Sequence, residues 1–410
     1  MIRCIFLLNL FLACTFSVQA QTAFWKRNVI DSAFSGADGV RLADVNGDHL
    51  PDIATGWEEG GFTKVYLHPG YELVRKKWPS VIAGKTPDVE DAVLVDLDSD
   101  GNKDVISSSE GDTKKVFVHW APSQATDYLD SSKWESQVLP ASEIDIQWMF
   151  AHPVQLDGLN GPDLVLGSKG KEAKIGWFQA PENPRNLDKW TWHPISPATW
   201  IMSIFMKDMD GDGDLDILTS DRKPGPSNGV RWLENPGNSK KQPEEWPSHF
   251  IGCEGLEVKF MDTGDLNGDG LEDVVATEST NQQIVWMKRM DPQGLNWERY
   301  TIDIPKLTGR GKAVKIGDIN GDGKPDLAHT TEASPDGGKS GVFWLSYRDN
   351  PGESQWDWHN ISGPEGYKFD RIELVDLDGD GDLDLLTCEE NFGSNSQGLG
   401  VIWYENPKKP

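Results

Sequence analysis

The chain has 410 residues and a formal net charge of −27, from 66 Asp and Glu residues against 39 Lys and Arg residues. This charge argues against nucleic acid and anionic membrane surfaces as partners, because both would repel the protein. The length would suit two or three ordinary domains, but one pattern repeats almost from end to end, which favours a single large domain.

The first twenty residues differ in composition from the rest. Arg3 precedes an apolar run over residues 5–16, and the small-residue sequence ending at Ala20 is typical of a cleavage site. We therefore expect residues 1–20 to be a signal peptide and residues 21–410 to be secreted, periplasmic or at the cell surface. Lipid anchoring at Cys14 is a minor alternative. No later apolar run is long enough to cross a membrane, so no membrane insertion is expected.

Cysteine usage agrees with a fold that is not built on disulfides. Cys4 and Cys14 would leave with the signal peptide, and only Cys253 and Cys388 would remain. They are far apart in the sequence, and whether they pair is open. The hydrophobic core and bound metal ions would then have to stabilise the fold.

Acidic loops with one spacing recur along the chain. In residues 208–216, acidic residues stand at positions 1, 3, 5 and 9 and Gly213 at position 6. This spacing is typical of a calcium loop, in which alternate side chains and one backbone carbonyl surround the cation and glycine allows the sharp turn. Position 12 is Thr219 instead of the Glu of a helical EF-hand, and short apolar runs on both sides predict strands.

Five further loops share this spacing and predict about six Ca²⁺ sites in all. The predicted ligand side chains are Asp44, Asn46, Asp48 and Asp52; Asp96, Asp98, Asp100 and Asp104; Asp208, Asp210, Asp212 and Asp216; Asp265, Asn267, Asp269 and Asp273; Asp318, Asn320, Asp322 and Asp326; and Asp376, Asp378, Asp380 and Asp384. A seventh loop at residues 157–163 is two residues shorter and contains Pro162, so we expect no calcium there. The loops start 51 to 61 residues apart, and such a period indicates a repeat architecture.

Each period reads as four strands. One apolar strand enters the acidic loop, a second leaves it, a third ends in Trp, and a fourth begins with Trp. Seven periods of four strands predict an all-β, seven-bladed β-propeller. The last period lacks its fourth strand, and residues 25–30 at the start of the mature chain would supply it and close the ring.

The acidic loops quoted above resemble those of the FG-GAP/VCBS-repeat propellers, which occur in integrin α-subunit heads and in many secreted bacterial proteins. The resemblance covers nearly the whole mature chain. It implies the propeller fold and calcium loops, and it leaves function open because such propellers serve adhesion, scaffolding and catalysis.

A functional site is expected at the channel mouth, which is the end of the central axis opposite the acidic loops. The start of each first strand and the end of each second strand meet there, and many of these residues are charged. The residues five or six positions after each loop are Glu58, Glu110, Lys169, Asp221, Glu278, Glu332 and Glu389, with Arg222 and Glu390 beside them. The entering strands add Glu90, Asp91, Lys259, Arg310, Lys312, Asp370 and Arg371.

Charges of both signs from several blades suit a hydroxyl-rich or acidic ligand such as a carbohydrate or uronate, although a polar rim is also expected of a propeller without a ligand. Fifteen of the eighteen Trp residues have core positions in the repeat. The other three, Trp57, Trp148 and Trp200, map to the channel mouth and could stack on sugar rings.

No catalytic motif is present in the sequence. His152 and His329 lie on strands that could face the channel, although a single His in a strand is more often a core residue. Glu332 and Lys312 are further candidates for proton transfer or for stabilising an enolate. Three hypotheses remain: a propeller that binds a carbohydrate or extracellular protein, a carbohydrate-acting lyase or dehydratase, and an adhesion or scaffold module without a small-molecule site. The aldos-2-ulose dehydratases resemble this chain only in their repeats.

Overall fold

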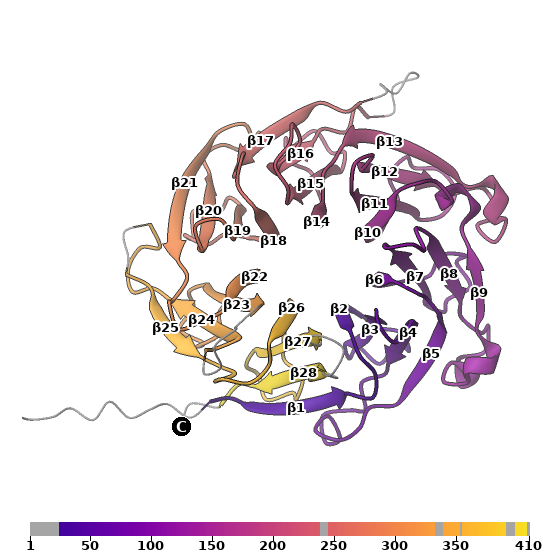
Figure 1. Cartoon of the computed structure of the whole chain (residues 1–410), viewed down its shortest axis with the longest axis horizontal. Helices are drawn as coiled ribbons and strands as arrows, with labels where there is room; N and C mark the ends of the chain where they lie inside the picture. The colour runs from indigo at the N-terminus through magenta and orange to yellow at the C-terminus, as the bar shows by residue number, and fades with distance from the viewer. Residues whose placement is uncertain (1–23, 238–244, 333–338, 353–354, 391–397, 408–410) are drawn as a thin grey trace, which may run out of the picture.

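Seven antiparallel four-stranded blades surround a central axis in the computed structural model (Figure 1). The structure describes residues 24–237, 245–332, 339–352, 355–390 and 398–407. The predicted signal peptide, residues 1–20, lies outside this range. In blades 1 to 6 the strands follow the chain order from the axis outward, and in blade 7 the outermost strand is β1, so the predicted seven-bladed propeller is confirmed.

The strand bounds repeat with the period of the acidic loops. Blade 1 contains β2 (Ala37–Ala43), β3 (Asp52–Trp57), β4 (Phe62–Tyr66) and β5 (Ser80–Lys85); blade 2 contains β6 (Val89–Val95), β7 (Asp104–Ser109), β8 (Val116–Trp120) and β9 (Glu135–Val138); blade 3 contains β10 (Gln147–Val154), β11 (Asp163–Lys169), β12 (Lys174–Gln179) and β13 (Thr191–Pro197). Short 3₁₀ turns accompany blades 2 and 3, namely η1 (Ala125–Asp127), η2 (Ser131–Lys133), η3 (Pro140–Ser142) and η4 (Leu187–Lys189).

The second half of the ring has the same plan. Blade 4 contains β14 (Ile201–Lys207), β15 (Asp216–Asp221), β16 (Gly229–Leu233) and β17 (Ser248–Gly252); blade 5 contains β18 (Val258–Gly264), β19 (Asp273–Glu278), β20 (Gln283–Arg289) and β21 (Trp297–Asp303); blade 6 contains β22 (Arg310–Gly317), β23 (Asp326–Glu332), β24 (Val342–Ser346) and β25 (Asp357–Asn360); blade 7 contains β26 (Lys368–Val375), β27 (Asp384–Glu390) and β28 (Gly400–Glu405). A single pair, Glu332 with Lys368, joins blades 6 and 7 into one sheet.

The first described strand completes the last blade. Strand β1 (Lys26–Asp31) pairs with β28, with Lys26 opposite Glu405 and Asn28 opposite Trp403. The ring is therefore closed by residues from both ends of the chain, as the sequence predicts. Closure removes the free edge that β28 would otherwise present to other chains.

Every innermost strand changes register near its start. The shifts fall in the intervals 38–41, 89–91, 148–151, 201–203, 258–261, 311–313 and 369–372. A bulge of this kind inserts an extra residue and turns its side chain in a new direction. All seven shifts lie at the end of the blade opposite the acidic loop, so they act on the channel mouth.

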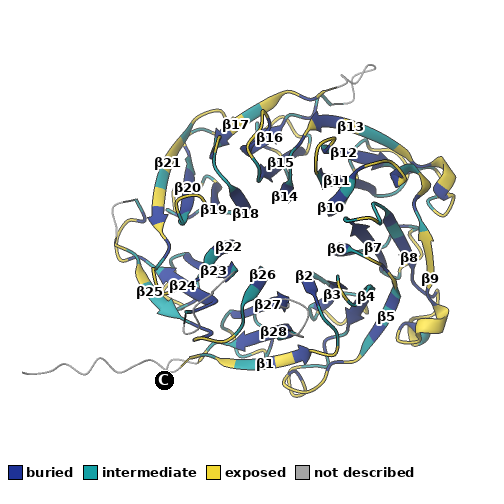
Figure 2. Ribbon diagram, in the orientation of Figure 1, coloured by how far each residue is buried: buried dark blue, intermediate teal, exposed yellow. Residues whose placement is uncertain are grey.

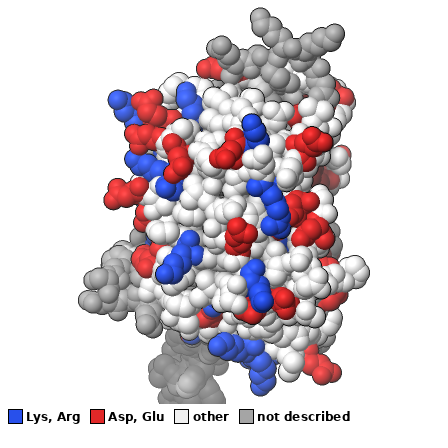
Figure 3. All heavy atoms as spheres, turned by 90° about the vertical axis from the view of Figure 1, so that its right-hand side faces the viewer, with Lys and Arg blue, Asp and Glu red and all other residues white. Residues whose placement is uncertain are grey.

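Burial decreases from the axis to the rim. The inner three strands of each blade are largely buried, whereas stretches of β1, β9, β17 and β21 are exposed (Figure 2). Cys253 and Cys388 are buried free thiols in different apolar clusters, so they do not pair with each other. On the flank in Figure 3, Lys and Arg side chains alternate with Asp and Glu. No helix in the described ranges is long and apolar enough to cross a membrane.

Deleting residues 24–31 should destabilise the whole ring. The deletion leaves β28 as an unpaired edge and removes Ile30 from the core, so we expect a loss on the order of 5 kcal/mol and a broader thermal transition. Lys26→Ala is the matched control, because it keeps the strand and removes only an exposed ion pair with Glu405. Equal melting temperatures for the deletion and the control would show that β1 does not close the fold.

Candidate functional site

The last Asp of every acidic loop is buried and accepts two backbone hydrogen bonds. In blade 4, Asp216 accepts from the N–H of Met209 within its loop and from the N–H of Asn235 just after the third strand, both at 2.8 Å. The same pair of bonds is made by Asp52, Asp104, Asp163, Asp273 and Asp384. Asp326 accepts one of them, from the N–H of Ile319, and its second bond comes from Asn320 within the loop. Burial raises the pKa of Asp216 to about 6.

Three loops bring carboxylates together as a cation site requires. In blade 4, oxygen atoms of Asp208, Asp210 and Asp216 lie within 4.8 Å of one another. Corresponding groups form in blade 2 and blade 7: Asp96, Asp98 and Asp104, and Asp376, Asp378 and Asp384. Position 5 is turned toward the loop backbone, as Asp212 accepts the N–H of Asp214 at 2.9 Å. In these three loops the structure thus brings the carboxylates at loop positions 1, 3 and 9 close together.

Two observations show that these loops suit a hard cation. Oδ1 of Asp96 in blade 2 and Oδ1 of Asn320 in the blade 6 loop are buried and have no hydrogen-bond partner among the described residues. In addition, arginines from neighbouring blades already contact the position 3 carboxylates, Arg185 with Asp98 and Arg75 with Asp378. A cluster of oxygen ligands that attracts cationic side chains and leaves oxygens unpaired is what Ca²⁺ would bind.

The blade 3 loop is held together by a side-chain amide instead of a group of carboxylates. The side-chain amide of Gln155 donates to the carbonyls of Leu159 and Gly161 at 2.8 and 2.7 Å, and its oxygen accepts the N–H of Gly158. Asp157 is held by the Gln179 amide at 2.5 Å. A neutral amide therefore organises this loop from within.

At the other end of the blades, strand alternation decides which residues reach the channel mouth. The residues five positions after the last loop Asp are 0 to 3% exposed in all seven blades. These are Trp57, Ser109, Ser168, Asp221, Glu278, Thr331 and Glu389. Successive side chains of a strand point to opposite faces, so the next residue in each blade points the other way. Those residues are Glu58, Glu110, Lys169, Arg222, Ser279, Glu332 and Glu390.

The structure therefore corrects the prediction that three charged residues present their side chains at the channel mouth. Asp221 accepts the N–H groups of Thr199 and Trp200, and Glu278 accepts the N–H of Asn281. Glu389 accepts the N–H groups of Tyr367 and Lys368 at the start of β26. All three are buried caps for backbone groups, so they offer no carboxylate to a ligand.

Two of the three expected stacking residues are also in the core. The Trp57 N–H donates to the Tyr66 hydroxyl at 3.0 Å, and the Trp148 N–H donates to the Ser142 carbonyl at 3.0 Å. Both indoles are 0% exposed, so neither presents a face to a sugar. Trp200 is partly buried and does lie near the mouth charges, with Lys169 and Arg222 each 4.4 Å from its ring centroid. These cations already contact the indole.

The innermost strand of each blade also places one residue at the channel mouth, and this residue lies at the register shift. The residue six positions before the first loop Asp lies at or inside the shift in every blade. These residues are Asp38, Glu90, Ala151, Met202, Lys259, Lys312 and Asp370. Asp38 is absent from the sequence-based set, although its spacing from Asp44 equals that of Asp370 from Asp376 and could have identified it.

The channel mouth is divided by charge. Blades 7, 1 and 2 contribute the acidic half, defined as Asp370, Glu390, Asp38, Glu58, Glu90 and Glu110. Blades 3 to 6 contribute the basic half, defined as Lys169, Arg222, Lys259, Arg310 and Lys312. Glu332 of blade 6 is the acidic exception, and it lies between Lys259 and Lys312. Ion pairs connect neighbouring blades, as Lys259 contacts Glu332 at 2.5 Å and Lys312 contacts Asp370 at 3.0 Å. Arg222 and Arg310 share Glu257.

Aromatic side chains fill the axis beside these charges. Phe150 and Phe260, from blades 3 and 5, pack edge to face with their ring centroids 5.3 Å apart. The Arg371 guanidinium lies 5.5 and 5.4 Å from the two rings, and Lys312 lies 5.7 Å from Phe260. Because blades 3 and 5 are not neighbours, this contact crosses the axis, and the predicted site residue Arg371 belongs to the packed centre.

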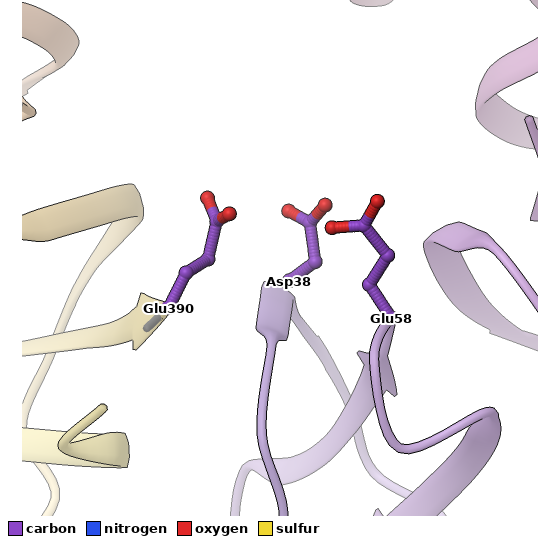
Figure 4. A group of neighbouring side chains, drawn as sticks. All are labelled: Asp38, Glu58 and Glu390. Atoms are coloured by element: carbon purple, nitrogen blue, oxygen red, sulfur yellow. The ribbon is translucent and has the colours of Figure 1, made fainter. Parts of the chain in front are cut away.

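Three carboxyl groups in the acidic half have a raised pKa. Burial, followed by the charges of Asp370 and Glu90, raises the pKa of Asp38 well above its usual range. Burial and the charge of Glu90 raise the pKa of Glu58 to about 7. Burial also raises the pKa of Glu390 to about 8, although Lys312 and Lys368 oppose it. Figure 4 shows Asp38, Glu58 and Glu390 side by side.

The four catalytic candidates have different surroundings. His329 is fully buried, lies against Phe343 and is 3.3 Å from the Thr277 hydroxyl, so no substrate reaches it. Burial and then the charges of Arg41 and Arg371 lower the pKa of His152 to about 4, which keeps it neutral.

Glu332 and Lys312 stay charged. Burial opposes ionisation of Glu332, but Lys312 and Lys259 lower its pKa to about 2. Burial also disfavours charge on Lys312, but Asp370 and Glu390 raise its pKa well above the usual value. Neither group is suited to exchange a proton near neutral pH, whereas a fixed charge can stabilise an ionic ligand.

Comparisons with known proteins agree with this architecture. Residues 265–329, from the blade 5 loop into blade 6, match the family model described as FG-GAP-like repeat. Two solved structures similar in fold are BBS1N in complex with ARL6DN, soaked with lead, and the Dos1 propeller. The chain is a propeller with an FG-GAP-like repeat.

The structural similarity extends over nearly the whole chain. The BBS1N structure has a TM-score of 0.53 and 11% identity, covering 94% of this chain and 98% of that one. The Dos1 propeller has a TM-score of 0.53 and 10% identity, covering 95% of this chain and 83% of that one. Identities this low show the fold alone. A comparison with curated proteins gives no match.

Replacing His329 should change acid stability. Burial and the charge of Lys259 lower the pKa of His329 to about 3, so below about pH 6.5 the unfolded chain binds a proton that the folded protein does not. Because of His329, each further drop of one pH unit below that point lowers the free energy of unfolding by up to about 1.4 kcal/mol. His329→Gln should lose less stability than the wild type between pH 6.5 and 4 in urea titrations. Parallel pH profiles would contradict a buried neutral His329.

Proposed function

We propose that this protein is an extracytoplasmic, calcium-loaded propeller whose channel mouth binds an anionic carbohydrate of the uronate type. The division of the mouth into acidic and basic halves carries this proposal. A uronate has a carboxylate on one side of each sugar ring and hydroxyls around the rest. Its carboxylate would pair with the basic half, and its hydroxyls would donate to carboxylates of the acidic half.

Arg222 is the residue best placed to bind the ligand carboxylate. Its guanidinium is planar and always charged, and it lies 4.4 Å from the Trp200 ring centroid while pairing with Glu257 at 2.7 Å. Lys169 contacts the same indole and pairs with Glu110. The aromatic ring and carboxylates hold the two cations in position before a ligand arrives, which reduces the entropy lost on binding.

The proposal predicts selective binding of oligouronates over neutral oligosaccharides of the same length. Arg222→Ala should weaken oligouronate binding about tenfold or more in calorimetry, since a charge-assisted hydrogen bond contributes about 1.5–3 kcal/mol. Lys171→Ala is the matched control, because it removes a nearby positive charge whose side chain is 94% exposed and pairs with the neighbouring Glu172. Equal affinity for neutral and acidic oligosaccharides, or an unchanged Arg222→Ala variant, would contradict the proposal.

Calcium binding by the six intact loops should stabilise the folded protein independently of any ligand at the channel mouth. An ion that binds only the folded protein adds about 2.7 kcal/mol per site at a free concentration a hundredfold above its Kd. A chelator should therefore lower the melting temperature, and Asp208→Asn with Asp210→Asn should reduce the gain from added Ca²⁺. Asp157→Asn in the blade 3 loop is the control with an unchanged gain. A melting curve insensitive to chelator would remove the calcium assignment.

One observation favours a lyase or dehydratase as the second candidate. Burial and the charges of Lys312 and Arg222 lower the pKa of Lys259 to about 7 against the opposing charge of Glu332, so part of it is a neutral amine at neutral pH. Lys259 is fully buried and hydrogen-bonded to the Gly311 carbonyl, so it would have to move past Glu332 to act as a base. Unsaturated uronate formed faster above pH 7, and lost in Lys259→Met, would establish this activity. Binding without product would exclude it.

A further inference from the structure

Three carboxylates at the channel mouth meet outside the acidic loops. Oxygen atoms of Asp38, Glu58 and Glu390 lie within 4.8 Å of one another, and the side chains come from blades 1 and 7 (Figure 4). Asp38 lies at the register shift of β2, while Glu58 and Glu390 lie at the ends of the neighbouring second strands. The group is at the opposite end of the blades from the acidic loops.

The cations near this group are already paired. Lys312 lies 3.0 Å from Oδ1 of Asp370, and Lys368 contacts Oε2 of Glu390. Within the described ranges, no Lys or Arg lies within 4.0 Å of Asp38 or Glu58. When ionised, the five carboxylates of Asp370, Glu390, Asp38, Glu58 and Glu90 face three ammonium groups, those of Lys312, Lys368 and Lys169, the last of which lies 4.0 Å from Glu90. The surplus of negative charge exceeds what one further monovalent cation would neutralise.

A buried oxygen supplies a second, independent observation. Asp370 is 1% exposed, its Oδ1 faces Lys312, and its carboxyl lies within hydrogen-bonding reach of the Asp38 carboxyl. Its Oδ2 accepts no hydrogen bond from an N–H or hydroxyl group of the described residues. A buried carboxylate oxygen without a donor is costly unless a cation or a shared proton satisfies it. Asp370 thus adds, beside Asp38, a buried oxygen that only a cation or a proton shared with Asp38 can satisfy.

We propose that Asp38, Glu58 and Glu390, with Asp370 beside them, bind one divalent cation at the channel mouth. Carboxylate oxygens without thiolate or imidazole ligands select a hard cation, Ca²⁺ or Mg²⁺. The remaining coordination positions would be open toward the mouth, where hydroxyl or carboxylate oxygens of a ligand could complete them. Only this last step rests on the proposed carbohydrate function.

Anomalous scattering tests the site in the wild-type protein. Crystals of the full mature chain grown in Ca²⁺ are soaked in Mn²⁺, which replaces both hard cations, and an anomalous map is calculated. We expect a peak between Asp38, Glu58 and Glu390, separate from any peaks in the acidic loops. Peaks confined to the acidic loops would overturn the proposal, since protons would then satisfy the mouth carboxylates.

A double variant tests the ligands in solution. Asp38→Asn with Glu58→Gln should bind one equivalent of Mn²⁺ fewer than the wild type in equilibrium dialysis, and Glu59→Gln, an exposed neighbour, should bind the same number. A double variant that binds as many ions as the control would overturn the ligand assignment. Oligouronate calorimetry on the wild type is run in parallel. A Mn²⁺ peak at the mouth without oligouronate binding would refute the carbohydrate function and leave the cation site intact.

Discussion

The structure depends on one hydrogen-bonded carboxylate that recurs in every blade. The last Asp of each acidic loop is buried between its loop and the neighbouring backbone and satisfies two N–H groups that would otherwise be unpaired. In blade 4 this role falls to Asp216, and in blade 3 to Asp163, whose bonds to Leu156 and Ala180 are retained although the loop is shorter. The carboxylate thus fixes the turn between the first and second strands, and cation binding is added to it.

Fixing one end of the blade determines what the other end presents. Strand alternation assigns each residue of the second strand to one face, and the register shift in the first strand turns another residue toward the axis. The repeat thereby gives two positions per blade that reach the channel mouth. Their identities differ between blades, and this difference produces an acidic half and a basic half on a symmetrical scaffold.

The sequence was sufficient for the fold because strand period, loop spacing and Trp positions all agree over seven repeats. It was less informative about the mouth. Asp221, Glu278 and Glu389 precede the inward-facing position by one residue, and only the register decides that they cap backbone groups instead. The bulges that turn Asp38 and Lys312 toward the axis leave no local signature, so the three-carboxylate group could not be assembled from spacing alone.

Packing explains the other differences. Trp57 and Trp148 occupy strand ends in the sequence, but their indoles turn into the blade cores, where they bury large apolar areas and find hydrogen-bond acceptors. His329 likewise occupies a second strand and is enclosed between blades 5 and 6 by Thr277 and Phe343. A single sequence does not distinguish these buried partners from a ligand.

The most direct test of this backbone role replaces the last loop Asp in blade 3, Asp163, because the shortened loop of that blade is not expected to bind a cation. Asp163→Ala leaves two buried N–H groups without acceptors, which costs about 1–3 kcal/mol for each, and the same holds for Asp216→Ala. Urea unfolding in the presence of chelator should show the two variants destabilised to a similar extent. If both variants unfold like the wild type in chelator, the carboxylate acts through the cation alone, and the backbone role is wrong.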